Sequence, residues 1–254
     1  MATYTIKAIK FCEQTVPGPQ MFFMSRWDEW MVADFLFFIL RRDDGQVMLI
    51  DTGVRDVDEI QPLVSAGVGA KGRFRMDMET QNIPLLLRKE GIDPGDVAYV
   101  FLSHLHYDHC SNVKLFPNAR FVVSRTGWHL TLDPPVDGLV PDILFTRGVV
   151  AYLAGEARDR LILVDDEAPE IVPGIGAFYV GGHTMCSQAI TVQTKQGLGR
   201  HPGRHRVLLR ESGEEPSHWP GVGHYPMPSG DGTCSGSGRH RGATPRPGFA
   251  GALS

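Results

Sequence analysis

Three histidines and one aspartate stand within the six residues His104–His109, directly after an apolar segment. By the chain's own composition, such a cluster arises by chance in roughly one sequence in a thousand. Alternate residues of an extended chain point to one side, so His104 and His106 can bind one metal ion. Where the chain turns, Asp108 and His109 can face a neighbouring ion. The segment therefore predicts a metal site rather than histidines that merely lie on a surface loop.

Imidazole nitrogens and carboxylate oxygens suit Zn²⁺ and, less exclusively, iron, manganese or cobalt. The four cysteines lie far apart, without the paired spacing of a zinc ribbon or a disulfide framework. The predicted site therefore keeps open coordination positions, which is typical of catalytic zinc rather than structural zinc. The cysteine pattern also favours a reducing compartment.

The composition allows a globular fold and disfavours two classes of partner. Of the 254 residues 42% are hydrophobic and 21% are charged, a balance that supports a packed core. The net charge of -4 gives no basic field for nucleic acid or anionic lipid. No 18-residue apolar run and no secretory leader is recognisable, so we expect a cytoplasmic protein that does not enter membranes.

The composition changes near residue 197, which predicts two parts, 1–197 and 198–254. The second part has 12 Gly, 7 Pro and 7 Arg but no Ile, Lys, Asn or Gln. So little apolar surface predicts a disordered tail. Two explanations stay open: a natural flexible tail, or a shifted reading frame in GC-rich coding DNA, a hypothesis that the nucleotide sequence around codons 194 to 200 would test.

The first 197 residues alternate between strand and helix patterns, which predicts sheets covered by helices. The turn Asp43-Asp44-Gly45 joins two apolar strands into a hairpin, and the predicted helix Glu79–Glu90 stops at Gly91. The expected strands are Tyr4–Phe11, Val32–Arg42, Gln46–Asp51, Val97–Leu102, Arg120–Ser124, Leu161–Val164, Ala177–Val180 and Ala189–Thr194.

Two further polar segments follow apolar strands. Asp51-Thr52-Gly53 ends one strand, and Gly181-Gly182-His183-Thr184 ends another. Asp51 can orient a ligating imidazole by accepting a hydrogen bond from its other ring nitrogen. Taken alone, Asp51-Thr52-Gly53 is equally well explained as a turn, and His183 alone is a weaker signal.

Together these segments resemble the metallo-β-lactamase-fold hydrolases. The order of Asp51-Thr52-Gly53, the His104–His109 motif and Gly182-His183 carries the resemblance, which spans residues 4–197. Two stretches, 83–109 and 171–183, resemble the N-acyl homoserine lactonases most closely. The resemblance implies an α+β fold, an αββα sandwich that is incomplete in its C-terminal half.

The resemblance also implies the ligand sets. His104, His106 and His183 would bind one zinc ion, and Asp108 and His109 a second. The intact family holds two zinc ions, so we expect one or two here. The family's bridging aspartate, final histidine and catalytic tyrosine have no recognisable match, although His224 is a weak candidate for that histidine.

The implied activity is opening of the lactone ring of an N-acyl homoserine lactone or a related ester, in which a hydroxide held by the metal ions attacks the carbonyl. Asp108 is the candidate catalytic residue, either as a metal ligand or as a proton shuttle. Alternatives are thioester or β-lactam hydrolysis, or a metal-binding fragment without activity. The expected partner is a small-molecule acyl lactone or ester, and the oligomeric state is left open.

Three lesser features also have two interpretations. An apolar N-terminal cluster can hold an acyl chain, but it is more often ordinary core or a dimer contact. Its members are Met21, Phe22, Phe23, Met24, Trp27, Trp30 and Met31. Cys110 and Cys186 lie near predicted ligands in the sequence, but small buried filler is their expected role.

Overall fold

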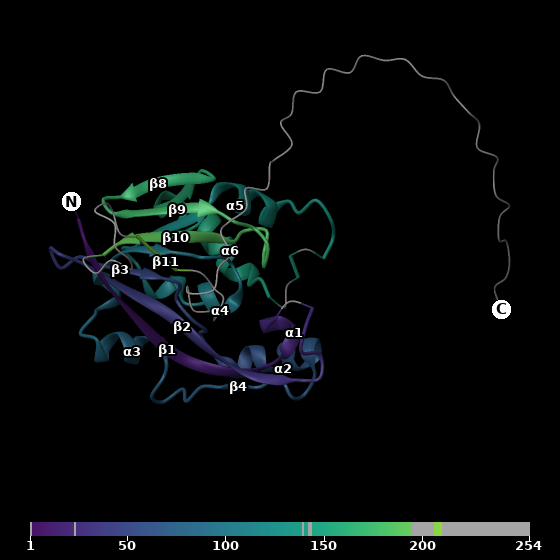
Figure 1. Cartoon of the computed structure of the whole chain (residues 1–254). Coiled ribbons are helices and arrows are strands. Elements are labelled where there is room, and N and C mark those ends of the chain that lie inside the picture. Colours follow the sequence, from purple (N-terminus) through teal and green to yellow (C-terminus); the bar gives the residue numbers. More distant parts are fainter. Residues whose placement is uncertain (1, 23, 139, 142–143, 195–205, 210–254) are drawn as a thin grey trace, which may run out of the picture. The chain divides into compact units, whose positions relative to one another are not determined.

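The computed structural model describes residues 2–22, 24–138, 140–141, 144–194 and 206–209. They lie within one compact unit, Met1–Gly213, and build two β-sheets with helices (Figure 1). Most of the predicted tail 198–254 lies outside the described residues. Strand β11 (Arg206–Leu209) is the exception, because it pairs with β10 (Gln188–Gln193). A short apolar run inside this Gly/Pro/Arg-rich segment therefore extends the sheet of β10 beyond residue 197. The division of the chain into 1–197 and 198–254 stays a prediction.

The larger sheet has seven strands, of which the long β1 and β2 run side by side in Figure 1. The first four strands in the order are antiparallel neighbours, whereas the pairs from β3 to β7 are parallel. In spatial order the strands are β4 (Phe74–Arg75), β1 (Tyr4–Pro17), β2 (Trp30–Arg42), β3 (Val47–Ile50), β5 (Val97–Phe101), β6 (Arg120–Ser124) and β7 (Leu161–Val164).

The smaller sheet has four antiparallel strands in the order β11-β10-β9-β8. Strand β8 spans Glu167–Val172, and β9 spans Ile175–Tyr179. The segment 180–187, which joins β9 to β10, carries one of the predicted ligands.

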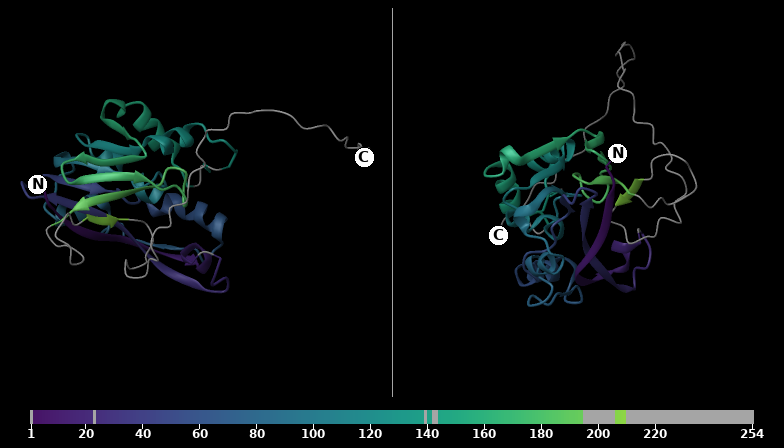
Figure 2. Two further views of the ribbon diagram at one scale, coloured as in Figure 1. Left: turned by 45° about the horizontal axis from the view of Figure 1, so that its top comes forward. Right: turned by 90° about the vertical axis from the view of Figure 1, so that its left-hand side faces the viewer.

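The core has two layers, because side chains of a strand alternate between its faces. Ile50 and Phe101 point into a cluster that also contains Ile190 of the smaller sheet, so this cluster lies between the sheets. Leu49 and Val100, their neighbours, point to a second cluster on the other face, where the helices pack. Figure 2 (right) shows the blue and teal helices on one side of the purple strand β1 and the yellow-green strand β11 on the other.

Helices α2 to α6 pack on one face of the larger sheet, because all five contribute their buried apolar side chains to the second cluster. One helical layer and two sheets make three of the four layers of the predicted αββα sandwich. The predicted α+β class is confirmed. The helices are α1 (Gly18–Met21), α2 (Val57–Val68), α3 (Ile83–Lys89), α4 (Tyr107–Cys110), α5 (Arg125–Leu132) and α6 (Arg147–Ala154), with three 3-10 turns, η1 (Pro94–Asp96), η2 (Val113–Leu115) and η3 (Arg158–Arg160).

The predicted elements are found with shifted ends. The Asp43-Asp44-Gly45 hairpin joins β2 to β3 as predicted. The predicted helix Glu79–Glu90 is shorter, because Asn82 caps α3 by accepting a hydrogen bond from Leu85 N. Pro84 then stands in the first turn, where its missing N–H costs nothing.

Candidate metal centre

Parallel pairing brings two predicted segments to one edge of the larger sheet. Strands β3 and β5 run in the same direction with Ile50 opposite Phe101, so both end at the same level. Asp51 follows the first strand, and its N–H donates to the carbonyl of Phe101 at 3.0 Å. Ser103 and the histidine segment follow the second strand. The sheet itself therefore places Asp51 beside the histidines.

His183 reaches this edge through Gln188, the first residue of β10. The Gln188 N–H donates to the carbonyl of Ser103 at 2.8 Å, and its side-chain amide donates to the carbonyl of Leu102 at 2.8 Å. Cys186 adds a third link, since its sulfur accepts from Leu105 N at 3.3 Å. These bonds join the loop that carries His183 to the segment that carries the other histidines.

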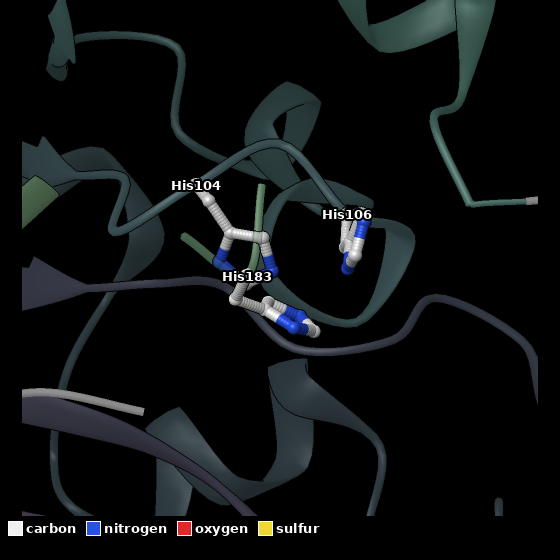
Figure 3. Close-up of side chains that lie close together, drawn as sticks. All are labelled: His104, His106 and His183. Atoms are coloured by element: carbon white, nitrogen blue, oxygen red, sulfur yellow. The ribbon is translucent and has the colours of Figure 1, made fainter. Parts of the chain in front are cut away.

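His104, His106 and His183 form the three-histidine cluster. One ring nitrogen from each lies within 4.8 Å of the other two, and Figure 3 shows the three side chains close together. The ring centroids are 4.6 Å apart for His104 and His106 and 4.8 Å apart for His106 and His183. The first two rings are buried and the third is exposed, so the cluster opens to solvent on the side of His183.

Burial keeps two of these imidazoles neutral. It lowers the pKa of His104 well below 6.5, and the neighbouring rings lower it further. Burial also lowers the pKa of His106 to about 4, although nearby Asp108 opposes the change. A neutral imidazole is the form that binds metal. At neutral pH His104 and His106 therefore offer lone pairs rather than positive charge.

Asp51, Asp108 and His109 form a second group, the carboxylate–histidine cluster. His109 Nδ1 lies 2.8 Å from Asp51 Oδ2, and His109 Nε2 lies 3.0 Å from Asp108 Oδ2. All three side chains are buried. Burial alone would raise the pKa of Asp108, but its interactions with His109 and His106 outweigh burial and lower it. Asp108 is therefore ionised at neutral pH.

Asp51-Thr52-Gly53 is held against the histidine segment by several hydrogen bonds. The Thr52 N–H donates to the carbonyl of His109 at 2.7 Å, and the Asn112 amide donates to the carbonyls of Thr52 at 2.9 Å and Gly53 at 3.1 Å. Asp51 itself has a φ of +64°, a strained value for a residue with a side chain. The surrounding bonds hold this strained residue where its carboxylate meets His109.

The donor set fits a divalent ion at the three-histidine cluster. Three imidazoles with an open side are a donor set that catalytic zinc uses. Asp108 and His109 offer a carboxylate oxygen and a ring nitrogen 3.0 Å apart for a second ion. Within the described residues this is all that the second position receives. The bridging aspartate, final histidine and tyrosine of the family have no recognisable match in the sequence, and the candidate His224 lies outside the described residues.

Sequence reasoning missed two neighbours of the cluster. Ser103 hydrogen-bonds Asp51 and lies 3.2 Å from His104 Nδ1; its position directly before the first histidine was the only signal. Phe145 packs edge-on against His106, with centroids 4.9 Å apart. No local pattern could have indicated Phe145, because its contact depends on how a distant segment folds back.

The cysteines near the cluster are buried filler with hydrogen bonds, as expected. Burial raises the pKa of both the Cys110 and the Cys186 thiol, which disfavours the thiolate that a metal binds. Cys110 donates to the carbonyl of His106 at 3.1 Å.

Two members of the apolar N-terminal cluster do not belong to the core, whereas a dimer contact or an acyl-chain contact of this cluster stays a prediction. Met24 and Trp27 are exposed over 65% and 64% of their surface. Phe23 lies outside the described residues. These side chains follow α1, where the chain leaves the sheet before returning as β2.

Solved lactonase structures share this fold. An N-acyl homoserine lactone hydrolase, solved with N-hexanoyl-L-homoserine at its catalytic metal centre, superposes with a TM-score of 0.59 at 20% identity, over 78% of this chain and 73% of the other. AidC, a dizinc quorum-quenching lactonase, gives a TM-score of 0.55 at 14% identity over 81% and 70%. At these identities the likeness establishes the fold.

Sequence comparison places the family. An N-acyl homoserine lactonase of Bacillus thuringiensis is 24% identical over 160 residues, 63% of this chain. The chain spans 58% of the length of that relative. The family model described as the metallo-beta-lactamase superfamily matches residues 36–196, which include both clusters. The resemblance predicted from the motifs is confirmed, and the chain belongs to the metallo-β-lactamase superfamily.

Proposed function

We propose that this chain is a zinc-dependent hydrolase that opens the lactone ring of an N-acyl homoserine lactone or cleaves a related ester. The three-histidine cluster carries the proposal, because its nitrogens lie within 4.8 Å of one another although His183 is remote in sequence. A fold that gathers three imidazoles at an open position is suited to a catalytic cation.

His104, His106 and His183 would hold one ion, and Asp108 and His109 would contribute to a second. When bound, such ions provide a nucleophilic water at neutral pH and polarise the substrate carbonyl. The dizinc lactonase among the structural neighbours supports zinc as the metal. The names of the curated relatives support an acyl lactone as substrate.

The chain's own residues would hold and move protons. Asp108, which is ionised at neutral pH, can accept a proton from the attacking water and return it to the departing ring oxygen. Asp51 keeps His109 in place through the 2.8 Å contact at Nδ1. In the balanced reaction, water adds to the carbonyl and the ring C–O bond breaks. The oxygen that leaves takes a proton, and the new carboxylic acid releases one at neutral pH.

A second candidate is a metal-binding protein without turnover. The observation that favours it is the second position, to which the described residues contribute only Asp108 and His109. An ion held by two protein ligands would bind weakly. Thioester and β-lactam hydrolysis stay as alternative activities, because one fold serves many substrates.

The test measures metal content and acid release on the purified full chain. Zinc per chain is determined by elemental analysis after dialysis, and hydrolysis of N-hexanoyl homoserine lactone is followed in a pH-stat. We expect at least one zinc ion per chain and lactone-dependent acid release. The His104→Ala and His106→Ala variants should lose both. His129→Ala, which removes an exposed histidine of α5, should keep both.

Each outcome has a defined meaning. Zinc without acid release from the lactone, a thioester or a β-lactam would favour the inactive metal-binding protein. Acid release only from a thioester or β-lactam would support hydrolase activity but contradict the lactone as substrate. A chain without zinc, or His104→Ala and His106→Ala variants with normal zinc, would reject the metal centre altogether.

A further inference from the structure

Ser103 lies where the two clusters meet. Its backbone N–H donates to Asp51 Oδ1 at 2.8 Å, and its hydroxyl donates to Asp51 Oδ2, also at 2.8 Å. The same hydroxyl oxygen lies 3.2 Å from His104 Nδ1 and 3.4 Å from His109 Nδ1. Ser103 and Asp51 are buried, so water does not compete freely for these bonds.

The count of protons determines the direction of these bonds. A serine hydroxyl has one proton and two lone pairs, and a carboxylate only accepts. The Ser103 proton goes to Asp51, so the Ser103 oxygen can only accept from His104. His104 Nδ1 must then carry the ring proton, which leaves the lone pair on Nε2 for a metal ion.

We propose that Ser103 is a positioning residue through which Asp51 orients the His104 ring. One carboxylate would then orient a metal ligand in each cluster. Asp51 acts directly on His109 at 2.8 Å and through the Ser103 hydroxyl on His104. The proposal rests on the metal centre described under the proposed function. It adds a residue that touches no ion itself but sets which nitrogen of His104 faces one.

The first experiment needs no metal. Two-bond proton–nitrogen correlation spectra of the metal-free full chain report which nitrogen of each histidine carries the proton. The His104 signals are assigned by their loss in His104→Gln. We expect the Nδ1–H form of His104 in the natural chain and a mixture of forms in Ser103→Ala. An Nε2–H form in the natural chain would overturn the proposal, whatever the metal content.

The second experiment titrates zinc against a chromophoric chelator. Loss of a partner that orients a ligand typically lowers metal affinity 10- to 100-fold, and we expect this for Ser103→Ala. Ser103→Thr keeps a hydroxyl and should restore most of the affinity. The control is Ser124→Ala, which also removes a buried hydroxyl, one that accepts from Gly127 N and caps α5. It should leave zinc affinity within about 2-fold, because its effect is on stability.

The outcomes separate this proposal from the proposed function. If the natural chain binds no zinc, the proposed function fails, and the spectra still decide whether Ser103 fixes the His104 proton. If the natural chain binds zinc and Ser103→Ala binds it equally well, the positioning role is wrong. The role is also wrong if Ser124→Ala loses as much affinity as Ser103→Ala, because the loss would then reflect general destabilisation.

Discussion

The two clusters at the edge of the larger sheet differ in how they are held. The three-histidine cluster gathers rings from two segments that are distant in sequence, and one of its members is exposed. The carboxylate–histidine cluster is buried, and each ring nitrogen of its His109 lies beside a carboxylate oxygen. Tertiary contacts assemble both groups, and the second is in addition held by contacts between its own carboxylates and imidazole.

This difference predicts which cluster depends on a metal ion. Neutral imidazoles attract one another weakly, so an ion is what would bind them together. Buried carboxylates beside an imidazole already have partners, so an ion at the second position must compete with existing bonds. We therefore expect the three-histidine cluster to bind zinc more tightly.

The largest predicted effect is the loss of tight zinc binding in His183→Ala. Orienting partners alone contribute 10- to 100-fold to affinity, so removal of a ligand should cost more than about 100-fold. His109→Ala should cost less at the tight site, because it leaves all three rings of the first cluster. Competition with a chromophoric chelator measures both, with His129→Ala as the matched control. Equal losses in the two variants would mean that the clusters bind as one unit.

The pH dependence of the free energy of unfolding of the metal-free chain should also distinguish the two clusters. The pKa of His106 is about 4 in the folded chain and near 6.5 when unfolded. Between these values the unfolded chain binds more protons, so stability falls as pH is lowered from 6.5 to 4. At about 1.4 kcal/mol per pKa unit, His106 accounts for on the order of 3 kcal/mol, and His104 acts in the same direction.

Urea unfolding in the presence of a chelator, at a series of pH values from 7.5 to about 3, measures this loss. In His106→Gln the dependence should become shallower over the same range. The lowered pKa of Asp108 acts elsewhere, because stability from an ionised carboxylate is lost only as pH falls below about 4. A steep loss confined to pH below 4 would assign the dependence to the carboxylate–histidine cluster instead.

Asp51→Asn should destabilise the carboxylate–histidine cluster even without metal. Asparagine tolerates the positive φ of this position, so the change tests the carboxylate. Asp51 now accepts hydrogen bonds from Ser103 and His109. An amide NH₂ in place of one carboxylate oxygen would face one of these donors and could not accept its hydrogen bond. We expect a loss of about 1 to 3 kcal/mol in the free energy of unfolding, the cost of buried groups left unsatisfied.

The control for Asp51→Asn is Asp165→Asn, at a carboxylate whose side chain is 79% exposed and paired with Arg125. Surface pairs contribute little, so its stability should change by less than about 0.5 kcal/mol. An Asp51→Asn chain as stable as this control would show that the carboxylate contributes no stability to its cluster.

Local patterns predicted much of the framework of the site. Strands β6 and β7 match the expected Arg120–Ser124 and Leu161–Val164, because a short apolar run between turn residues needs no distant partner to be recognised. Helix α2 was missed, since Pro62 lies within its pattern. Strand β1 continues beyond Phe11 to Pro17 because it pairs with β2 along its length.

The candidate site could be predicted only as far as its residue types allow. The density of histidines between 104 and 109 indicates a metal, and Asp51 at a strand end indicates an orienting carboxylate. Neither pattern predicts the direction of the Ser103 hydrogen bonds or the contact of His109 with two carboxylates. Both depend on the level at which β3 and β5 end. The link from Cys186 to Leu105 likewise exists only after the two sheets have come together.

The smallest predicted effect tests the link between Cys186 and Leu105. The substitution is at Gly127 of α5, which lies beside Cys186. A Cβ at Gly127 would lie 2.4 Å from Cys186 Cα, so Gly127→Ala must push away the loop that carries His183. Overpacking costs about 1 to 3 kcal/mol, offset by up to about 1 kcal/mol from the better helix propensity of alanine. Gly148→Ala in α6 is the matched control, because a Cβ there meets nothing within 4 Å.

Urea unfolding should therefore show opposite signs for the two glycine variants, a net loss of about 1 to 2 kcal/mol for Gly127→Ala and a gain of up to about 1 kcal/mol for Gly148→Ala. Zinc affinity should fall only in Gly127→Ala, since only that change displaces a segment with a ligand. The carboxylate–histidine cluster does not include this loop, so the histidine proton positions at His109 should be unchanged. A shift at His109 would show that the two clusters are mechanically joined through the smaller sheet, and not only through Asp51 and Ser103.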